Sequence, residues 1–151
     1  MSSSTLQSDS TRPACINKLM AHFETMNVDS VDGLDEIYHP NIHFQDPIHE
    51  IKGLGALTTY FSHLNKNLVS GHFDFKGVDR AGQRYFFEWV MTVKTKRPKK
   101  TIVLHGMTKV EIDGERIIRH RDYFDLGEMV YEHVPLLRGL VRAVKKRLAK
   151  Q

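Results

Sequence analysis

The sequence predicts a single α+β domain in which helices cover one face of a curved sheet, and three observations support this prediction. The chain has 151 residues, of which 40% are hydrophobic and 26% charged, enough for one domain with its own core but not for two. Up to about Leu68, apolar residues recur at three- and four-residue spacing, as in helices. From Gly71 they alternate with a period of two, as in strands. Helices first and strands afterwards favour an α+β fold over an alternating βαβ arrangement.

Three helices and a short strand are expected in the first half. The helical spacing predicts helices over residues 13–26, 31–38 and 57–68. Between the second and third helices, residues 42–46 alternate as in a short strand that ends at Pro47. Each helix has one apolar side, so all three are expected to pack on a common sheet.

Four strands are expected in the second half. Residues 72–78, 84–94, 101–112 and 116–126 alternate between apolar and polar and are separated by turn signals. Consecutive strands joined by short turns indicate an antiparallel meander. A helix packed across such a bent sheet leaves a cone-shaped cavity.

Residues 134–151 are expected to form a separate basic amphipathic helix. The tail holds six Lys and Arg residues and no acid, and removing these six charges from the formal net charge of +4 leaves −2 for residues 1–133. A slightly acidic body does not favour a nucleic-acid binder. The helix suits packing on its own domain, binding to an acidic partner, or peripheral contact with a membrane.

The first twelve residues and the single cysteine bear on localisation. Residues 1–12 are rich in Ser and Thr and lack periodicity, so we expect a disordered lead-in. They also lack the basic start and apolar stretch of a signal peptide, and no run of about 18 apolar residues occurs in the chain. Cys15 has no second cysteine with which to form an internal disulfide, which fits a reducing compartment. We therefore expect a cytoplasmic protein.

Two segments carry a resemblance to a known family. The stretches IYHPNIHFQDP at residues 37–47 and DGERIIRHRD at residues 113–122 resemble SnoaL-like members of the nuclear-transport-factor-2-like superfamily. The likeness covers roughly residues 14–133, and we place the domain at 13–133. It implies a cone-shaped, cystatin-like curved sheet wrapped around helices, with the basic helix as an addition. The superfamily includes steroid delta-isomerases, polyketide cyclases and limonene epoxide hydrolase beside non-catalytic scaffolds, so it does not name the reaction.

The resemblance also implies a partner. Members usually pair through the outer face of the sheet, so a homodimer is expected. Strand alternation turns five large side chains outward, and these would form the self-complementary patch of a two-fold interface. They are Phe86, Val90, Val103, Met107 and Tyr123.

Three residues are candidates for catalysis. Asp46 stands in Phe-Gln-Asp-Pro, which resembles the segment where steroid isomerases place their proton-shuttling aspartate. Asp122 matches the acid/base aspartate of SnoaL-type cyclases and an acidic catalytic residue of limonene epoxide hydrolase, and His120 has a counterpart in the cyclases. Strand alternation places His120 and Asp122 on one face, so their side chains are expected to be neighbours. The alternatives are a turn carboxylate at Asp46 and a His-Asp pair that only fixes its strand.

An apolar lining is expected around these groups. Alternation and the resemblance together give the lining as Phe23, Phe44, Phe87, Trp89, Met91, Leu104, Gly106, Thr108 and Phe124. Gly106 would leave room for a ligand, whereas Phe23, Trp89 and Met91 stand where the related enzymes have polar groups. No spacing of histidines or carboxylates indicates a metal, and neither a metal nor an organic cofactor is expected.

Two functions remain open from the sequence. A hydrophobic small molecule in such a pocket could undergo acid/base chemistry of the isomerase, cyclase or hydrolase type. Alternatively, the same cavity belongs to a non-catalytic ligand-binding or scaffold protein.

Overall fold

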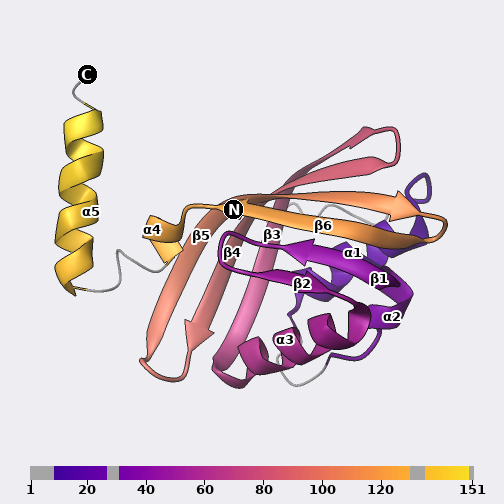
Figure 1. Cartoon of the computed structure of the whole chain (residues 1–151), viewed down its shortest axis with the longest axis horizontal. Coiled ribbons are helices and arrows are strands. Elements are labelled where there is room, and N and C mark those ends of the chain that lie inside the picture. Colours follow the sequence, from indigo (N-terminus) through magenta and orange to yellow (C-terminus); the bar gives the residue numbers. More distant parts are fainter. Residues whose placement is uncertain (1–8, 27–30, 130–134, 150–151) are drawn as a thin grey trace.

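The computed structural model describes residues 9–26, 31–129 and 135–149. Three helices lie on one face of a bent six-stranded sheet (Figure 1): α1 (Ala14–Glu24), α2 (Leu34–Ile37) and α3 (Leu54–Lys66). The strands are β1 (Tyr38–Gln45), β2 (Glu50–Lys52), β3 (Leu68–Ala81), β4 (Arg84–Thr95), β5 (Lys100–Asp113) and β6 (Arg116–Phe124). The short α4 (Leu126–Met129) and then α5 (Pro135–Leu148) follow, with α5 outside the cone. The predicted fold class is confirmed.

The sheet is mixed, in the order β2-β1-β6-β5-β4-β3. β3 to β6 form the predicted antiparallel meander. β1 joins the other edge of β6 in parallel, and the unpredicted β2 pairs antiparallel with β1. The parallel pair places the end of β1 beside the part of β6 that carries the candidate catalytic residues.

Two predicted helix ends are wrong because the last residue of each predicted helix belongs to a strand and pairs with a neighbouring strand. Tyr38, expected at the end of the second helix, begins β1 and pairs with Ile117. Leu68, expected at the end of the third helix, begins β3 and pairs with Thr95. Helical spacing alone cannot show where a chain leaves a helix to join a distant strand.

The region before α1 is partly described. Residues 1–8 of the expected lead-in lie outside the described residues. From Asp9 onward the chain forms a turn, in which the Thr11 amide donates to Asp9 Oδ1 at 2.8 Å. The Asn17 side chain in α1 donates to the Asp9 carbonyl oxygen at 2.9 Å, which ties this turn to the helix.

The core lies between the sheet's inner face and the helices. Inward residues of β4 and β5, such as Phe87, Leu104 and Val110, are fully buried, and Ile16 and Leu19 of α1 pack in the same cluster. Such burial is the main term that stabilises the fold. None of the described helices is long and apolar enough to cross a membrane.

The outer face of the sheet keeps apolar side chains in solvent, and we propose that it joins two copies of the chain. Val103, Met107 and Tyr123 are exposed there, and Met107 and Tyr123 are cross-strand partners. Large side chains of this kind form the buried centre of a two-fold interface.

Charging this patch should therefore separate the copies. We expect Met107→Lys to halve the mass measured by sedimentation equilibrium, because burying an unpaired ammonium is costly. Ile48→Lys, at an equally exposed apolar residue in the turn between β1 and β2, is the control and should leave the mass unchanged. A wild-type protein that is monomeric at high concentration would contradict the proposal.

Candidate active site

A chain of hydrogen bonds crosses four strands on the inner face of the sheet. The Tyr38 hydroxyl of β1 lies 3.0 Å from His120 Nδ1 of β6, and His120 Nε2 lies 2.9 Å from Asp122 Oδ1. From the other side, Thr108 Oγ1 of β5 donates to the same Asp122 oxygen at 2.5 Å. The Trp89 indole N–H of β4 donates to Thr108 Oγ1 at 2.8 Å. His120, Asp122 and Thr108 are therefore in direct contact.

Sheet register explains why these side chains meet. Thr108 lies directly opposite Asp122 in the β5–β6 ladder, so the hydroxyl and the carboxylate share one face. Trp89 lies opposite Gly106, and its indole reaches diagonally to Thr108. Strand alternation buries His120 and half-buries Asp122, while the intervening Arg121 is exposed.

Tyr38 and Asp122 contact the two ring nitrogens of His120 from opposite sides. Burial, and after it the negative charge of Asp122, raises the pKa of the Tyr38 phenol well above its ordinary value. Tyr38 therefore keeps its proton, and its hydroxyl lies within hydrogen-bond distance of His120 Nδ1. Because an ionised carboxylate only accepts hydrogen bonds, His120 Nε2–H donates to Asp122 Oδ1.

The two oxygens of Asp122 are consequently unequal. Oδ1 accepts hydrogen bonds from both His120 and Thr108. Oδ2 has no hydrogen-bond partner among the described residues, and the side chain is 20% exposed. One carboxylate oxygen is thus fixed and the other is available.

Asp122 borders a small apolar cavity. The cavity has a volume of about 20 Å³, room for about one water molecule. It is lined by Leu19, Phe23, Phe73, Phe75, Phe87, Trp89, Thr108, His120 and Asp122. The expected cone is therefore nearly filled by aromatic side chains from the sheet and α1.

Several predicted lining residues lie elsewhere. Phe23, Phe87, Trp89 and Thr108 do border the cavity. Leu104 is fully buried in the core, and Met91 and Phe124 pack against the core as partly buried residues. Phe44 packs beside the imidazole of His120, with ring centroids 4.8 Å apart. These four residues are not among those that border the cavity beside Asp122.

Gly106 leaves no room for a ligand, and this corrects the sequence prediction. A Cβ built on Gly106 would lie 2.5 Å from Cζ2 of Trp89, because the distal ring of the indole rests directly over the glycine. The space that a side chain at position 106 would take is thus filled by the indole of Trp89. The hydrogen bond from this indole to Thr108 holds the ring in place.

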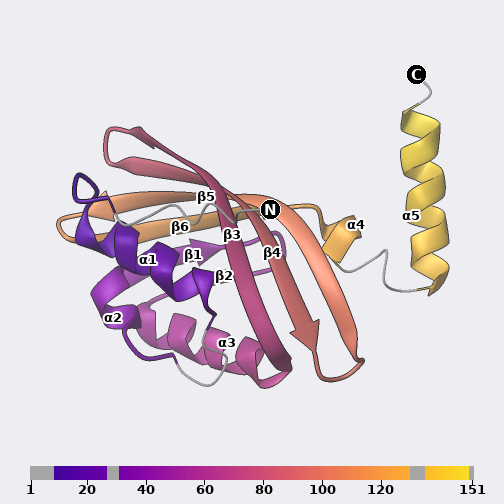
Figure 2. The same cartoon turned by 180° about the vertical axis from the view of Figure 1, so that it is seen from behind.

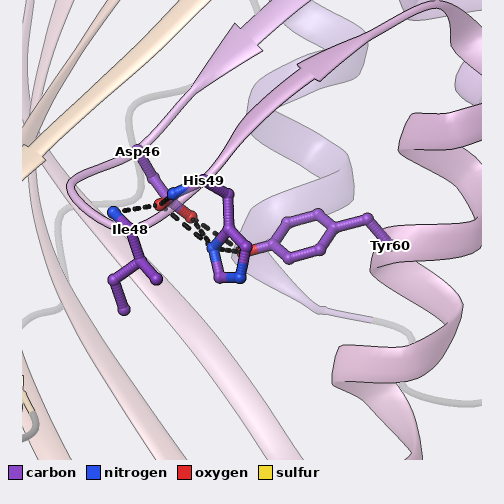
Figure 3. A network of polar contacts seen from close by, with 4 residues as sticks. All are labelled: Asp46, Ile48, His49 and Tyr60. Atoms are coloured by element: carbon purple, nitrogen blue, oxygen red, sulfur yellow. Dashed lines mark hydrogen bonds and ion pairs between the residues drawn. The ribbon is translucent and has the colours of Figure 1, made fainter.

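Asp46 belongs to a separate cluster in the turn between β1 and β2 (Figure 3). Its Oδ1 accepts hydrogen bonds from the backbone N–H groups of Ile48 and His49, with N–O distances of 2.7 and 2.6 Å. Its Oδ2 accepts the Tyr60 hydroxyl of α3 at 2.8 Å, and His49 Nδ1 lies 3.2 Å from both oxygens. This is the turn carboxylate that the sequence left open as an alternative.

The electrostatics of Asp46 oppose a role as a base. Its side chain is only 6% exposed, and burial by itself would raise the pKa. The hydrogen bonds from Ile48, Tyr60 and His49 outweigh burial, so the pKa of the carboxyl is lowered. Asp46 is therefore a stable anion with both oxygens occupied.

Sequence reasoning missed Tyr38, Phe73 and Phe75. Tyr38 was assigned to a helix, although it has the same parity as the buried Ile42 and Phe44 of β1. Phe73 and Phe75 occur in a run correctly predicted as a strand, and their alternation could have indicated an inward face.

Among the described residues, no group of three His, Cys, Asp or Glu side chains could hold a metal ion.

The contact between Gly106 and Trp89 gives a test of packing. We expect Gly106→Ala to lower the free energy of unfolding by about 1–3 kcal/mol, because a methyl group would be forced into a fully packed indole. Combining it with Trp89→Phe, which shortens the ring, should recover part of the loss. Chemical denaturation of the two single variants and the double variant measures this coupling. Strict additivity would contradict the contact.

The lowered pKa of Asp46 gives a test by pH. Because its folded-state pKa lies below the unfolded value, its stabilising effect is complete above the unfolded pKa and is lost as pH falls through the folded pKa. We expect Asp46→Asn to cost about 1–2 kcal/mol at neutral pH. The difference from wild type should shrink in acid. Denaturant titrations across pH measure it, and a difference that grew in acid would contradict the assignment.

Comparison with known proteins identifies the family and the fold. A family model described as a SnoaL-like domain matches residues 19–120. A protein of ketosteroid isomerase-like fold from Catenulispora acidiphila, crystallised with trimethylamine, is 18% identical with a TM-score of 0.67, covering 77% of this chain and 88% of its own. A proposed polyketide cyclase from Acidithiobacillus ferrooxidans is 17% identical with a TM-score of 0.65, covering 82% and 93%.

A proposed SnoaL-like polyketide cyclase from Jannaschia is 13% identical with a TM-score of 0.65, covering 80% of this chain and 92% of its own. No curated protein sequence matches the chain. At these identities the solved structures establish the fold alone, and the match over residues 19–120 establishes the family. The chain belongs to the SnoaL-like family.

Proposed function

We propose that the protein is an acid/base enzyme of the isomerase, cyclase or hydrolase type, acting on a hydrophobic small molecule, with Asp122 as the group that takes up the proton. The observation that carries the proposal is that Asp122 borders an apolar cavity and has one oxygen, Oδ2, with no hydrogen-bond partner among the described residues. A general base needs a free lone pair and a fixed orientation. Asp122 has both, whereas Asp46 has no free oxygen.

His120 acts as the positioning residue. Its Nε2–H holds Asp122 Oδ1, and Tyr38 holds the opposite ring nitrogen, so the imidazole cannot turn without breaking a buried hydrogen bond. Thr108 fixes the same carboxylate oxygen from β5. When Oδ2 takes a proton from a C–H bond of the substrate, these contacts keep the carboxyl group in place.

The cavity restricts the kind of substrate. The side-chain N–H and O–H groups that line the cavity belong to Trp89, Thr108 and His120. Each already donates a hydrogen bond, Trp89 to Thr108 and the other two to Asp122. No lining donor is left to stabilise an enolate oxygen. The substrate must therefore delocalise the negative charge itself, as a conjugated or aromatic ketone does.

Entry of a substrate requires side chains to move. A cavity of about 20 Å³ holds no hydrophobic metabolite. Phe23 and Phe73 are only half-buried and lie edge to face, whereas Trp89 is fully buried and hydrogen-bonded. The two phenylalanines therefore form the movable side of the cavity.

We place the reaction in the cytoplasm, since Cys15 is a free, buried thiol.

A non-catalytic function is the second candidate. The observation that favours it is the replacement of polar groups by rings, with Phe23 and Trp89 directly against the cavity. A protein that only holds a ligand needs apolar contact and no spare donor. In that case Asp122 would serve to fix its strand.

Solvent exchange distinguishes the two functions without knowledge of the natural substrate. We expect the protein to accelerate deuterium uptake from D₂O at the acidic carbon of 2-tetralone, a hydrophobic ketone, followed by NMR. Asp122→Asn should reduce this acceleration by about 10²–10⁴-fold, because the amide cannot accept the proton. Asp46→Asn is the matched control and should retain it.

Three outcomes would contradict the proposal. Equal exchange by wild type and Asp122→Asn would remove Asp122 as the base. Loss of exchange in Asp46→Asn alone would transfer that role to Asp46. A small molecule retained in native mass spectrometry by both wild type and Asp122→Asn, with no exchange of any probe, would favour the binding function.

A further inference from the structure

The helix α5 exposes a continuous apolar stripe. Leu140, Val144 and Leu148 follow one another at four-residue spacing and so lie on one side of the helix. Their exposed fractions are 63%, 50% and 63%. A stripe of this kind is normally buried against another surface.

The contacts of α5 with the rest of the chain leave this stripe free. Lys145 Nζ lies 2.8 Å from Asp125 Oδ2, and Val141 lies against Gly127, where a built Cβ would come within 3.3 Å of it. Val141 and Lys145 are successive positions along one edge of the stripe. In both views α5 stands beside the α4 end of the domain and clear of the sheet (Figures 1 and 2).

The charge on α5 is of one sign. Arg142, Lys146 and Arg147 are exposed, and no acidic residue occurs after Glu132. At 100° per residue Arg147 borders the apolar stripe, while Arg142 and Lys146 lie on the opposite side. A surface that covered the stripe would therefore have to be both apolar and negatively charged.

We propose that α5 docks the protein on an anionic lipid surface. The apolar stripe would enter the boundary between head groups and acyl chains, and the basic side chains would reach the negatively charged head groups. A second copy of α5 fits less well, because pairing two such helices would bring like charges together without any acidic partner. Docking on its own domain would have buried the stripe, which is exposed.

Vesicle sedimentation tests the proposal with the full chain. The probe is large unilamellar vesicles of phosphatidylcholine, with or without about one-third phosphatidylserine. We expect binding to the phosphatidylserine vesicles only. High salt should weaken this binding, since attraction between exposed charges is screened.

Three variants separate the contributions. Leu140→Gln, Val144→Gln and Leu148→Gln in one chain remove the stripe and keep the charge. Lys146→Glu with Arg147→Glu reverses two charges and keeps the stripe. Each should weaken binding about tenfold or more. The control, Lys96→Glu with Lys99→Glu, makes the same change in net charge at the turn between β4 and β5 and should leave binding unchanged.

Four results would overturn the proposal. The first is no binding to phosphatidylserine vesicles, and the second is equal binding by the wild type and the triple glutamine variant. The third is a halved mass of the triple glutamine variant in sedimentation, and the fourth is a lower melting temperature of that variant. The third would show that α5 pairs with a second copy, and the fourth that the stripe packs on its own domain. Trp89 fluorescence verifies that each variant has kept its folded core.

Discussion

The inner face of the sheet depends on one buried polar chain, in which Tyr38, His120, Asp122, Thr108 and Trp89 link β1, β6, β5 and β4. A carboxylate against an apolar cavity is costly unless its charge is met by donors. Here Asp122 Oδ1 accepts hydrogen bonds from His120 of its own strand and from Thr108 of β5, and Tyr38 and Trp89 extend the chain to β1 and β4. Loss of any member would leave a buried group unpaired, which is why the chain constrains both the fold and the site.

The two candidate carboxylates differ in their donors more than in their burial. Asp46 is the less exposed of the two, yet a turn and Tyr60 supply donors to both of its oxygens and lower its pKa. Asp122 receives its hydrogen bonds on one oxygen only. The distinction arises from local geometry: a turn directs successive backbone N–H groups at one side chain, whereas the inner face of a sheet offers only side chains. A proton acceptor is therefore expected on the sheet.

Local pattern predicted much of this arrangement, and long-range packing decided the rest. Period-two alternation correctly placed His120 and Asp122 inward, because it depends only on strand geometry. It could not identify the partner of Tyr38, because His120 lies 82 residues away and on a strand that pairs with β1 in parallel. Gly106 shows a second limit. A glycine on an inner face can accommodate a ligand or a neighbouring ring, and only the position of Trp89 decides between them.

The same packing connects the cavity to the chemistry proposed for it. Phe23 borders the cavity, and its ring contacts both Phe61 and Phe73. A phenylalanine cannot donate a hydrogen bond to an oxyanion, and together with Phe73 it gives the cavity beside Asp122 an apolar wall. The proposed base, held through one oxygen beside aromatic rings that offer no free donor, suits a substrate that is acidic through its own conjugation. In the proposed function, the aromatic lining of the cavity therefore selects the substrate.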